Sequence, residues 1–444
     1  MTAAESGSLN GISSKDVLRR RLTLFGLFLV GVMSYVDRTI VSVLQVPIKQ
    51  ELGLSDTQLG TLTGISFALV YTSMAIPIAR LADRTNRKYV ILASLAIWSA
   101  MTAFSGFATS FLMLVLLRTG VGFGEAGSVP ATHSTIADLY PREQRARAVA
   151  AWGLSLPAGM IVGLIAAGQI AENLGWRTAF WLIGGLGIAL IPLLFFLMRE
   201  PARGRFDPVS ARAVATPPMR ESLSTLWRLK TFRLMVIGGS LHAFVQYSLM
   251  NWNAPFYTRV HGMSLSDTAN ALALLSGLGG AIGIWSGGWL ADRLGSRDVR
   301  WQLRVPALAM AAMVPLAAIQ YVTTSASVSI AVGLVSSALL VFYFAPIVAV
   351  PMLVVHSRLR AFASSVVLVV FNLVGLGLGP TVTGVISDYF INNYGMAEES
   401  LRYSLVIVLL PSLFAAFLFW RASQHLPLEA LDRASSSLPK GDHE

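Results

Sequence analysis

Long apolar stretches alternate with short polar ones along almost the whole chain. An α-helix needs about 20 predominantly apolar residues to cross the hydrocarbon core of a bilayer, and most of the apolar stretches reach that length. The pattern therefore predicts an all-α integral membrane protein with twelve transmembrane helices. The predicted spans are residues 21–45, 57–81, 89–108, 111–138, 145–171, 176–198, 232–258, 267–290, 303–322, 326–354, 361–390 and 401–421.

A polar stretch, residues 199–230, separates the sixth span from the seventh and contains Pro208 and the pair Pro217-Pro218. Proline interrupts helices, so this stretch is expected to be a linker between two pseudo-symmetric six-helix halves. The predicted domains are an N-terminal half in residues 1–200, a cytoplasmic linker in 201–230 and a C-terminal half with a cytoplasmic tail in 231–444.

Composition agrees with a membrane protein, since 54% of the residues are hydrophobic, 13% are charged and the mean hydropathy is +0.63. An ordinary soluble protein has about a quarter of its residues charged. The chain has no cysteine, which excludes a disulfide framework, a thiolate metal site and a cysteine nucleophile. We expect neither a metal nor another cofactor.

The net charge of +11 is distributed very unevenly among the loops. Nearly all of the 34 lysines and arginines lie on the side of the predicted membrane where both termini lie. The exceptions are Arg38 and Arg118 inside spans, and Lys49, Arg177, Arg259 and Arg402 on the other side. Basic loops stay on the cytoplasmic side, so both termini are expected in the cytoplasm, and the charge is expected to face anionic lipid rather than nucleic acid.

The two predicted halves share a loop motif. Leu-Ala-Asp-Arg occurs after the second span, with Asp83 and Arg84, and again after the eighth span, with Asp292 and Arg293. A duplicated six-span unit with a midplane site is the architecture of secondary transporters that move by rocking one half against the other.

Four ionisable side chains lie well inside predicted spans: Asp37, Arg38, Arg118 and Glu125. Charges at membrane depth are costly and indicate a functional site by default. The spacing of seven residues between Arg118 and Glu125 places both on one helix face, about 10 Å apart. Glycines around them allow another backbone or a ligand to approach closely.

These features together resemble the major facilitator superfamily over nearly the whole chain. Three of them are similar to the spinster family of lipid transporters: Tyr35-Val36-Asp37-Arg38, residues 82–88, and Arg118 followed by residues 122–126. The resemblance implies proton-coupled transport of lysophospholipids or sphingosine-phosphate-like lipids by alternating access, in a bacterial inner membrane, by a monomer surrounded by membrane lipids.

Glu125 is predicted to be the principal protonation switch and Asp37 the second. Burial favours the protonated form of a carboxyl group, whereas a neighbouring arginine favours the carboxylate. Two conformations that change this balance would take up and release a proton. The structural alternative is that Arg118 and Glu125 only hold the fourth span against the first.

Arg118, together with Arg38 and Tyr35, is predicted to bind an anionic headgroup, because a guanidinium offers bidentate donation and stays charged when desolvated. The headgroup would then compete with Glu125 for the arginine. For Arg38, a structural pairing with Asp37 is equally compatible with the sequence.

In the C-terminal half, His242, Gln246 and Asn372 are candidate substrate contacts, and aromatic residues such as Tyr343 are candidates for an apolar wall. A structural role is the alternative for His242. No acid or base lies in the interior of the tenth span, so the proton machinery is predicted to lie entirely in the N-terminal half.

The motif residues Asp83, Arg84, Asp292 and Arg293 are expected to latch one conformation of the transport cycle, as the family resemblance implies, or to serve folding alone.

Gly122, Gly124 and Gly127 match a dinucleotide fingerprint, but no strand precedes them, and no nucleophile constellation or phosphate-binding loop is present. The sequence therefore argues against an enzyme. A proton-coupled symporter of a small organic anion is the alternative to a lipid transporter.

Overall fold

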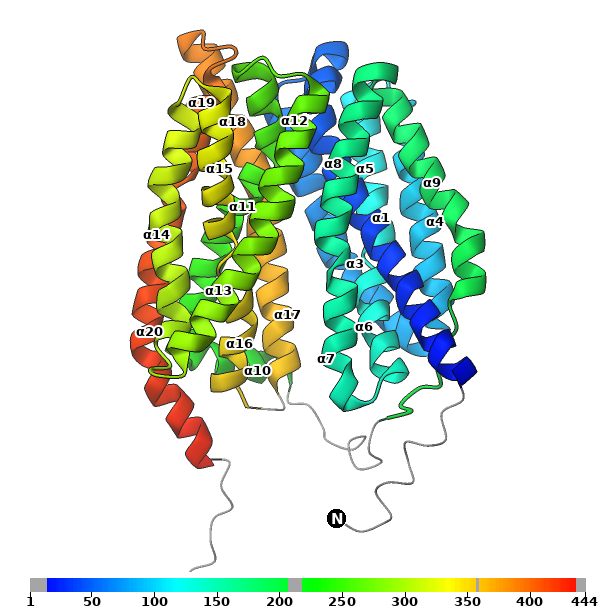
Figure 1. Cartoon of the computed structure of the whole chain (residues 1–444), viewed down its shortest axis with the longest axis vertical. Coiled ribbons are helices and arrows are strands. Elements are labelled where there is room, and N and C mark those ends of the chain that lie inside the picture. Colours follow the sequence, from blue (N-terminus) through cyan, green and yellow to red (C-terminus); the bar gives the residue numbers. More distant parts are fainter. Residues whose placement is uncertain (1–13, 207–217, 357–358, 437–444) are drawn as a thin grey trace, which may run out of the picture.

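The computed structural model of the protein describes residues 14–206, 218–356 and 359–436, and within these residues every regular element is helical. Figure 1 shows two bundles side by side, an N-terminal bundle (α1–α9) and a C-terminal bundle (α11–α20). The start of α1 and the end of α20 lie at the same end of the molecule, which we call the terminal end. The opposite end, with the α1–α2 and α18–α19 connections, is the distal end.

The N-terminal bundle consists of α1 (Ser14–Leu52), α2 (Asp56–Thr63), α3 (Ile65–Arg84), α4 (Arg87–Ser105), α5 (Phe111–Glu125), α6 (Ser128–Leu139), α7 (Arg142–Gly153), α8 (Ser155–Leu174) and α9 (Trp176–Leu197). The C-terminal bundle, preceded by α10 (Met219–Arg228), consists of α11 (Lys230–Val260), α12 (Leu265–Leu272), α13 (Gly280–Gly295), α14 (Trp301–Val322), α15 (Ala326–Leu340), α16 (Phe344–Val354), α17 (Arg360–Val370), α18 (Gly379–Tyr394), α19 (Ser400–Val408) and α20 (Leu410–Ser436). Two π-helical segments, η2 (Ala273–Gly279) and η4 (Phe371–Leu378), connect α12 to α13 and α17 to α18.

Eleven of the predicted spans coincide with described helices that are long and apolar enough to cross a membrane. The remaining one, residues 232–258, lies in α11, whose 31 residues are sufficient in length but include several polar side chains. Several spans are broken into two helices, as at Gly64 between α2 and α3. The structure is therefore consistent with twelve spans, and α10 lies within the predicted linker.

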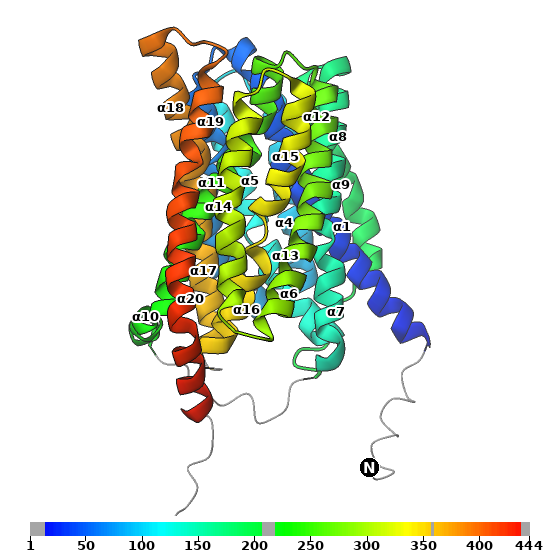
Figure 2. The same ribbon diagram turned by 60° about the vertical axis from the view of Figure 1, so that its left-hand side comes forward.

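The hydrophobic cores show how the bundles meet. One core near the distal end combines residues from both bundles, such as Leu44 of α1 and Trp252 of α11. A second core draws on the C-terminal bundle and α10 alone, around Phe232 and Phe419, and a third lies mostly in the N-terminal bundle, around Trp98. The bundles are thus joined near the distal end and have separate cores toward the terminal end. In a view turned by 60°, the start of α1 and the end of α20 again lie at the same end of the molecule (Figure 2).

Glycines allow the two bundles to touch backbone to backbone where α2 packs against α18. A Cβ atom on Gly60 of α2 would come within 2.9 Å of the carbonyl carbon of Pro380, and one on Gly384 of α18 would come within 2.7 Å of that of Asp56. Such distances are too short for real Cβ contacts, so no larger residue fits without moving a helix.

We expect Gly60→Ala to destabilise the protein by about 1–3 kcal/mol, because overpacking a tight contact forces the helices apart. The thermal unfolding midpoint in detergent would measure the loss. Gly185→Ala in α9 is the matched control, since its new methyl group would have no neighbour within 4 Å. The control should be neutral or stabilising by up to about 1 kcal/mol, because alanine has the higher helix propensity. Equal midpoints for the two variants would contradict the expected clash.

Candidate functional site

A cavity of about 380 Å³ lies between the two bundles. Its walls come from α1, α3, α6, α7 and α8 on one side, and from α11, α13–α17 and the two π-helical segments on the other. Most lining side chains are aliphatic or aromatic, and among the described lining residues only Arg38 carries a formal charge. Of the predicted site residues, Tyr35, Arg38, Gln246 and Asn372 line this cavity.

Arg38 of α1 connects the cavity with a buried carboxylate. Its Nε atom donates a hydrogen bond of 2.7 Å to Oε2 of Glu125, and its Nη2 atom lies 2.7 Å from the same oxygen. Three aromatic rings surround the guanidinium, with the centroids of Tyr35, Phe67 and Tyr71 at 5.8, 5.3 and 4.9 Å. Arginine stacks well on aromatic faces, so the rings hold this cation at the cavity wall without neutralising it.

Glu125 is the last residue of α5 and is fully buried. The C-terminal end of a helix disfavours negative charge, so the carboxylate depends on nearby cations and donors. Arg38 and the Ser34 hydroxyl, at 3.1 Å, both donate to its Oε2 atom, while Oε1 has no hydrogen-bond partner in the described chain. Gly122 and Gly124 let α5 pack closely against α3 and α4, which brings Glu125 into this position.

The second ion pair joins Arg118 of α5 to Asp37 of α1. Arg118 Nη1 lies 3.0 Å from Asp37 Oδ2, and the Thr102 hydroxyl donates to the other oxygen of Asp37. Both members of the pair are buried. Neither lines the large cavity, and within the described residues Arg118 Nε has no hydrogen-bond partner. This pair is therefore more secluded than the pair formed by Arg38 and Glu125.

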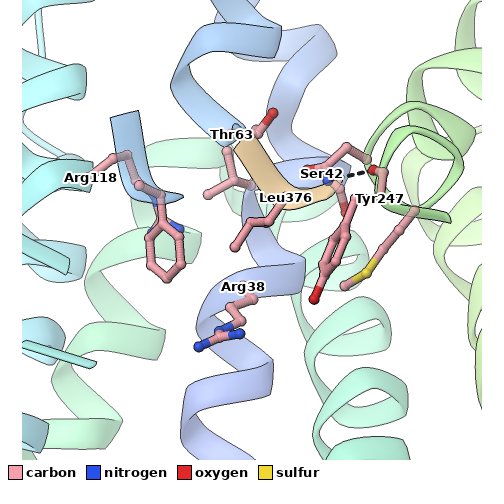
Figure 3. Close-up of a pocket in the computed structure, with 10 residues that line it drawn as sticks. Arg38, Ser42, Thr63, Arg118, Tyr247 and Leu376 are labelled. Atoms are coloured by element: carbon pink, nitrogen blue, oxygen red, sulfur yellow. Dashed lines mark hydrogen bonds between the residues drawn. The ribbon is translucent and has the colours of Figure 1, made fainter. Parts of the chain in front are cut away.

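A small cavity of about 30 Å³ adjoins Arg118 (Figure 3). It lies beside Arg38 and Tyr247, which also line the large cavity, and Ser42, Thr63 and Asn251 complete its polar wall. A water molecule needs roughly 10–15 Å³ of such space, so the small cavity is large enough for one or two waters. It gives the buried Arg118 a polar neighbourhood close to the larger cavity.

The structure changes the pairing that the sequence indicates. A structural pairing of Arg38 with Asp37 does not occur, because adjacent residues of a helix point in different directions. Arg118 and Glu125 share a face of α5, as their spacing predicts, but each pairs with a residue of α1 and not with the other. Two crossed ion pairs thus join the first span to the fourth.

His242 of α11 lies outside the large cavity and is fully buried. Its Nδ1 atom lies 2.9 Å from the Ser412 hydroxyl, and its Nε2 atom lies 2.7 Å from the carbonyl oxygen of Leu340. Both ring nitrogens are therefore occupied within the C-terminal bundle. This environment fits the structural role that the sequence leaves open for His242.

Among the described residues, no hydrogen bond or ion pair joins Asp83 and Arg84 of the first motif loop to Asp292 and Arg293 of the second. Arg203 donates to the backbone carbonyl of Asp83, and Arg84 is exposed. In the other loop, Gln302 donates to Asp292 over 3.3 Å, and Arg293 lies 5.1 Å from the ring centroid of Trp289. Their role as a latch stays a prediction.

One residue of the first motif loop has a role that sequence reasoning missed. Arg87 is 1% exposed and donates to Asp138 of α6 over 2.5 Å and to Glu200, just after α9, over 2.7 Å. It ties three segments of the N-terminal bundle together at the terminal end. The signal for this role is a basic residue that follows Leu-Ala-Asp-Arg in both motif loops, Arg87 in the first and Arg297 in the second.

Sequence reasoning also missed a polar network that joins the bundles at the distal end. Asp56 of α2 is fully buried and accepts hydrogen bonds from Arg259 of α11 at 3.0 and 2.9 Å, from Ser387 of α18 at 2.5 Å and from Lys49 of α1. In addition, Asp388 of α18 accepts from the backbone N–H groups at the start of α2, at 2.9 and 2.7 Å.

All four basic residues that the sequence places on the distal side have such partners. Besides Lys49 and Arg259, Arg177 pairs with Glu51 at 2.7 Å, and Arg402 donates to the carbonyl oxygens of residues 321–323 and to Glu399. A basic residue is rare on that side, and each one here holds a structural contact. That scarcity is the signal that could have identified the distal network.

Comparisons with known proteins place this geometry in a family. The sequence matches the Major Facilitator Superfamily over residues 27–380. It is 33% identical to an MFS-type efflux pump of Mycolicibacterium smegmatis, with 92% of this chain and 94% of the pump covered. It is 28% identical to Protein spinster homolog 1 of Homo sapiens, with 88% and 78% covered.

Among solved structures, the chain is similar to a bacterial homolog of the human lysosomal transporter Spinster in an inward-facing, unoccupied conformation. The TM-score is 0.83 at 30% identity, with 93% of this chain and 98% of that chain covered. The nucleoside transporter NupG shares the fold, with a TM-score of 0.66 at 17% identity and with 90% and 98% covered. On these matches, the chain belongs to the major facilitator superfamily, is related to the spinster proteins, and is a multi-pass inner-membrane transporter rather than an enzyme.

Proposed function

We propose that the protein is a proton-coupled transporter of amphiphilic lipids with an anionic or zwitterionic headgroup, working by alternating access. The observation that carries the proposal is the pair formed by Arg38 and Glu125, because one member lines the cavity and the other is fully buried behind it. A proton on Glu125 would therefore act on a substrate through Arg38, without contact between proton and substrate.

Protonation removes the charge of Glu125 and leaves Arg38 without its counterion. A buried cation without a partner is costly, so an anionic headgroup in the cavity then gains affinity for Arg38. Deprotonation restores the ion pair and weakens headgroup binding. The other charged groups near Glu125 are Asp37 and Arg118, which already pair with each other, and we assign Asp37 as the second proton site.

Arg118 is proposed as a second contact for the headgroup, reached through the small cavity that Arg38 also lines. Asp37 would have to move to release Arg118, and Thr102 holds Asp37 in the present conformation by donating to its other oxygen. Tyr35, Gln246 and Asn372 complete the proposed substrate contacts of the large cavity.

The cavity wall favours a lipid over a small organic anion. A small, highly charged substrate needs several cations, whereas here one cation stands among neutral polar side chains and a larger number of aliphatic and aromatic ones. An acyl chain gains roughly 0.8 kcal/mol for each CH₂ group that it buries in such surroundings.

We also propose that the terminal end faces the cytoplasm, so the cavity lies beneath a closed periplasmic end.

Binding to purified protein tests the proposal. The probes are lysophosphatidylglycerol and galactonate, measured at two pH values on either side of neutrality with wild type, Arg38→Ala and Arg118→Ala. We expect wild type to bind the lysolipid, more tightly at the lower pH, and each alanine variant to lose about tenfold or more in affinity. Arg228→Ala on the exposed face of α10 is the control and should bind as wild type does.

Binding of galactonate without lysolipid would replace the lipid assignment with the small-anion symporter. Unchanged lysolipid affinity in Arg118→Lys would remove Arg118 from the site, because lysine lacks the planar fork that bidentate binding requires.

A further inference from the structure

Two side-chain amides on one helix present hydrogen-bond donors to the large cavity. Gln246 and Asn253 of α11 both line it. They are seven residues apart, so they lie on the same face of the helix, about 10 Å from each other along its axis. Neither is charged, and neither belongs to the motifs that carry the family resemblance.

A tyrosine hydroxyl fixes the orientation of each amide. Tyr343 donates a hydrogen bond of 2.6 Å to Oε1 of Gln246, and Tyr321 donates one of 2.8 Å to Oδ1 of Asn253. Both tyrosines are buried, at 3% and 0% exposure. Rotating either amide by half a turn would leave the buried phenolic hydrogen without an acceptor, which carries a large penalty.

With the oxygens held in this way, the NH₂ groups are left for the cavity. No described residue accepts a hydrogen bond from the amide nitrogen of Gln246 or Asn253. Asn251, on the same helix, differs because its Nδ2 atom donates to the backbone carbonyl of Tyr247 at 2.9 Å. A ligand that fills the cavity must therefore offer acceptor oxygens to Gln246 and Asn253, or leave two donors unpaired.

We propose that Gln246 and Asn253 form a two-point donor subsite for ligand oxygens that carry no hydrogen, such as those of a phosphate and an ester carbonyl. The subsite rests on the proposed lipid transport and narrows its substrate class. A lysophospholipid has a phosphate and an acyl ester carbonyl, which are both acceptors. A sphingosine-phosphate-like lipid replaces the ester with an ammonium group, which can only donate, and a hydroxyl group, whose oxygen accepts but whose hydrogen then needs an acceptor of its own. The subsite selects the lysophospholipid.

The test compares oleoyl lysophosphatidic acid with sphingosine phosphate, which share a phosphate monoester and a chain of similar length. We expect wild type to bind lysophosphatidic acid about tenfold more tightly than sphingosine phosphate. The difference corresponds to one polar group of the subsite that sphingosine phosphate leaves unpaired. Gln246→Glu and Asn253→Asp keep the shape but replace the donor with an acceptor, so each should reduce or reverse the preference. Tyr343→Phe and Tyr321→Phe free the amides to rotate and should reduce the preference about threefold without adding charge.

Asn393→Asp, at an exposed position of α18, adds the same charge away from the cavity and should keep the wild-type ratio. Equal binding of the two lipids to wild type would overturn the subsite while leaving lipid transport intact. The subsite would also be overturned if Gln246→Glu and Asn253→Asp left the ratio of the two lipid affinities unchanged. Failure of both lipids to bind while galactonate binds would instead contradict the proposed function itself. Thermal midpoints of all variants, measured in parallel, identify any that fail to fold.

Discussion

Glu125→Gln should remove the pH dependence of substrate binding and abolish proton-driven accumulation, while exchange of substrate without a gradient continues. The amide has the shape of the protonated carboxyl group but cannot release a proton. Arg38 is then permanently without its counterion, so lysolipid affinity should equal that of wild type at low pH and stay there as the pH rises. At high pH the variant should bind about tenfold more tightly than wild type, the effect of one lost charge partner.

Proteoliposomes loaded with lysophosphatidylglycerol would distinguish proton-driven accumulation of the lysolipid from its exchange without a gradient. Gradient-driven uptake measures coupling, and counterflow measures exchange. Glu221→Gln, an exposed carboxylate on α10, is the control and should behave as wild type in both assays. A pH profile that survives in Glu125→Gln would move the proton site elsewhere, and Asp37→Asn would be the next variant to examine.

The fold could be predicted from the sequence because each span leaves a local signal. About 20 apolar residues in a row are costly anywhere except in a membrane or a core, so the chain shows its helices one by one. The span in α11 shows where this signal weakens, because Gln246, Tyr247, Asn251 and Asn253 reduce its hydropathy. Three of these four residues line the large cavity, so the weak hydropathy itself marks the functional helix.

The identity of the buried charges could also be predicted, but not their partners. Successive residues of a helix are about 100° apart around its axis, so Asp37 and Arg38 point to different turns of α5. Asp37 meets Arg118, and Arg38 meets Glu125, about two helical turns further along the same face of α5. Spacing along α5 alone could not show this, because the choice depends on how α1 and α5 cross.

Contacts between distant segments left the weakest signals. Asp56 and Arg259 are 203 positions apart, and Tyr343 holds Gln246 from the turn between α15 and α16. Neither pair follows a periodic pattern. For the distal network a clue exists, since lysine and arginine are rare on the periplasmic side of membrane proteins, and the sequence predicts Lys49 and Arg259 to lie on that side. For the tyrosine-held amides, the sequence offers none.

The distal network makes a second strong prediction. Asp56→Asn should shift the protein toward conformations that are open at the distal end. Asp56 is the one carboxylate that Arg259 and Lys49 share, and it is fully buried. Removing its charge leaves both cations without a counterion. That loss is costly only while the distal end is closed and water is kept away from them. Breaking a buried ion pair costs roughly 3–5 kcal/mol, which would change the equilibrium between the two states by a factor of about a hundred or more.

Spin labels at Asn173→Cys of α8 and Asn393→Cys of α18 would report the separation of the bundles at the distal end, and the chain has no native cysteine to interfere. In the doubly labelled protein we expect a single short distance between the two spin labels. Adding Asp56→Asn should make a longer distance between the labels dominant. Arg177→Gln is the matched control, because its pair with the half-exposed Glu51 lies within the N-terminal bundle, and exposed pairs contribute little.

Adding Arg259→Gln to Asp56→Asn removes one of the unpaired cations from the closed state. Charges that act through the same partner are not additive, so the double variant should regain part of the short distance. A distance distribution that Asp56→Asn leaves unchanged would mean that the close backbone packing around Gly60 and Gly384, not the ion pairs, keeps the distal end closed. Recovery in the double variant would show instead that the unpaired charge, rather than the loss of hydrogen bonds, drives the opening.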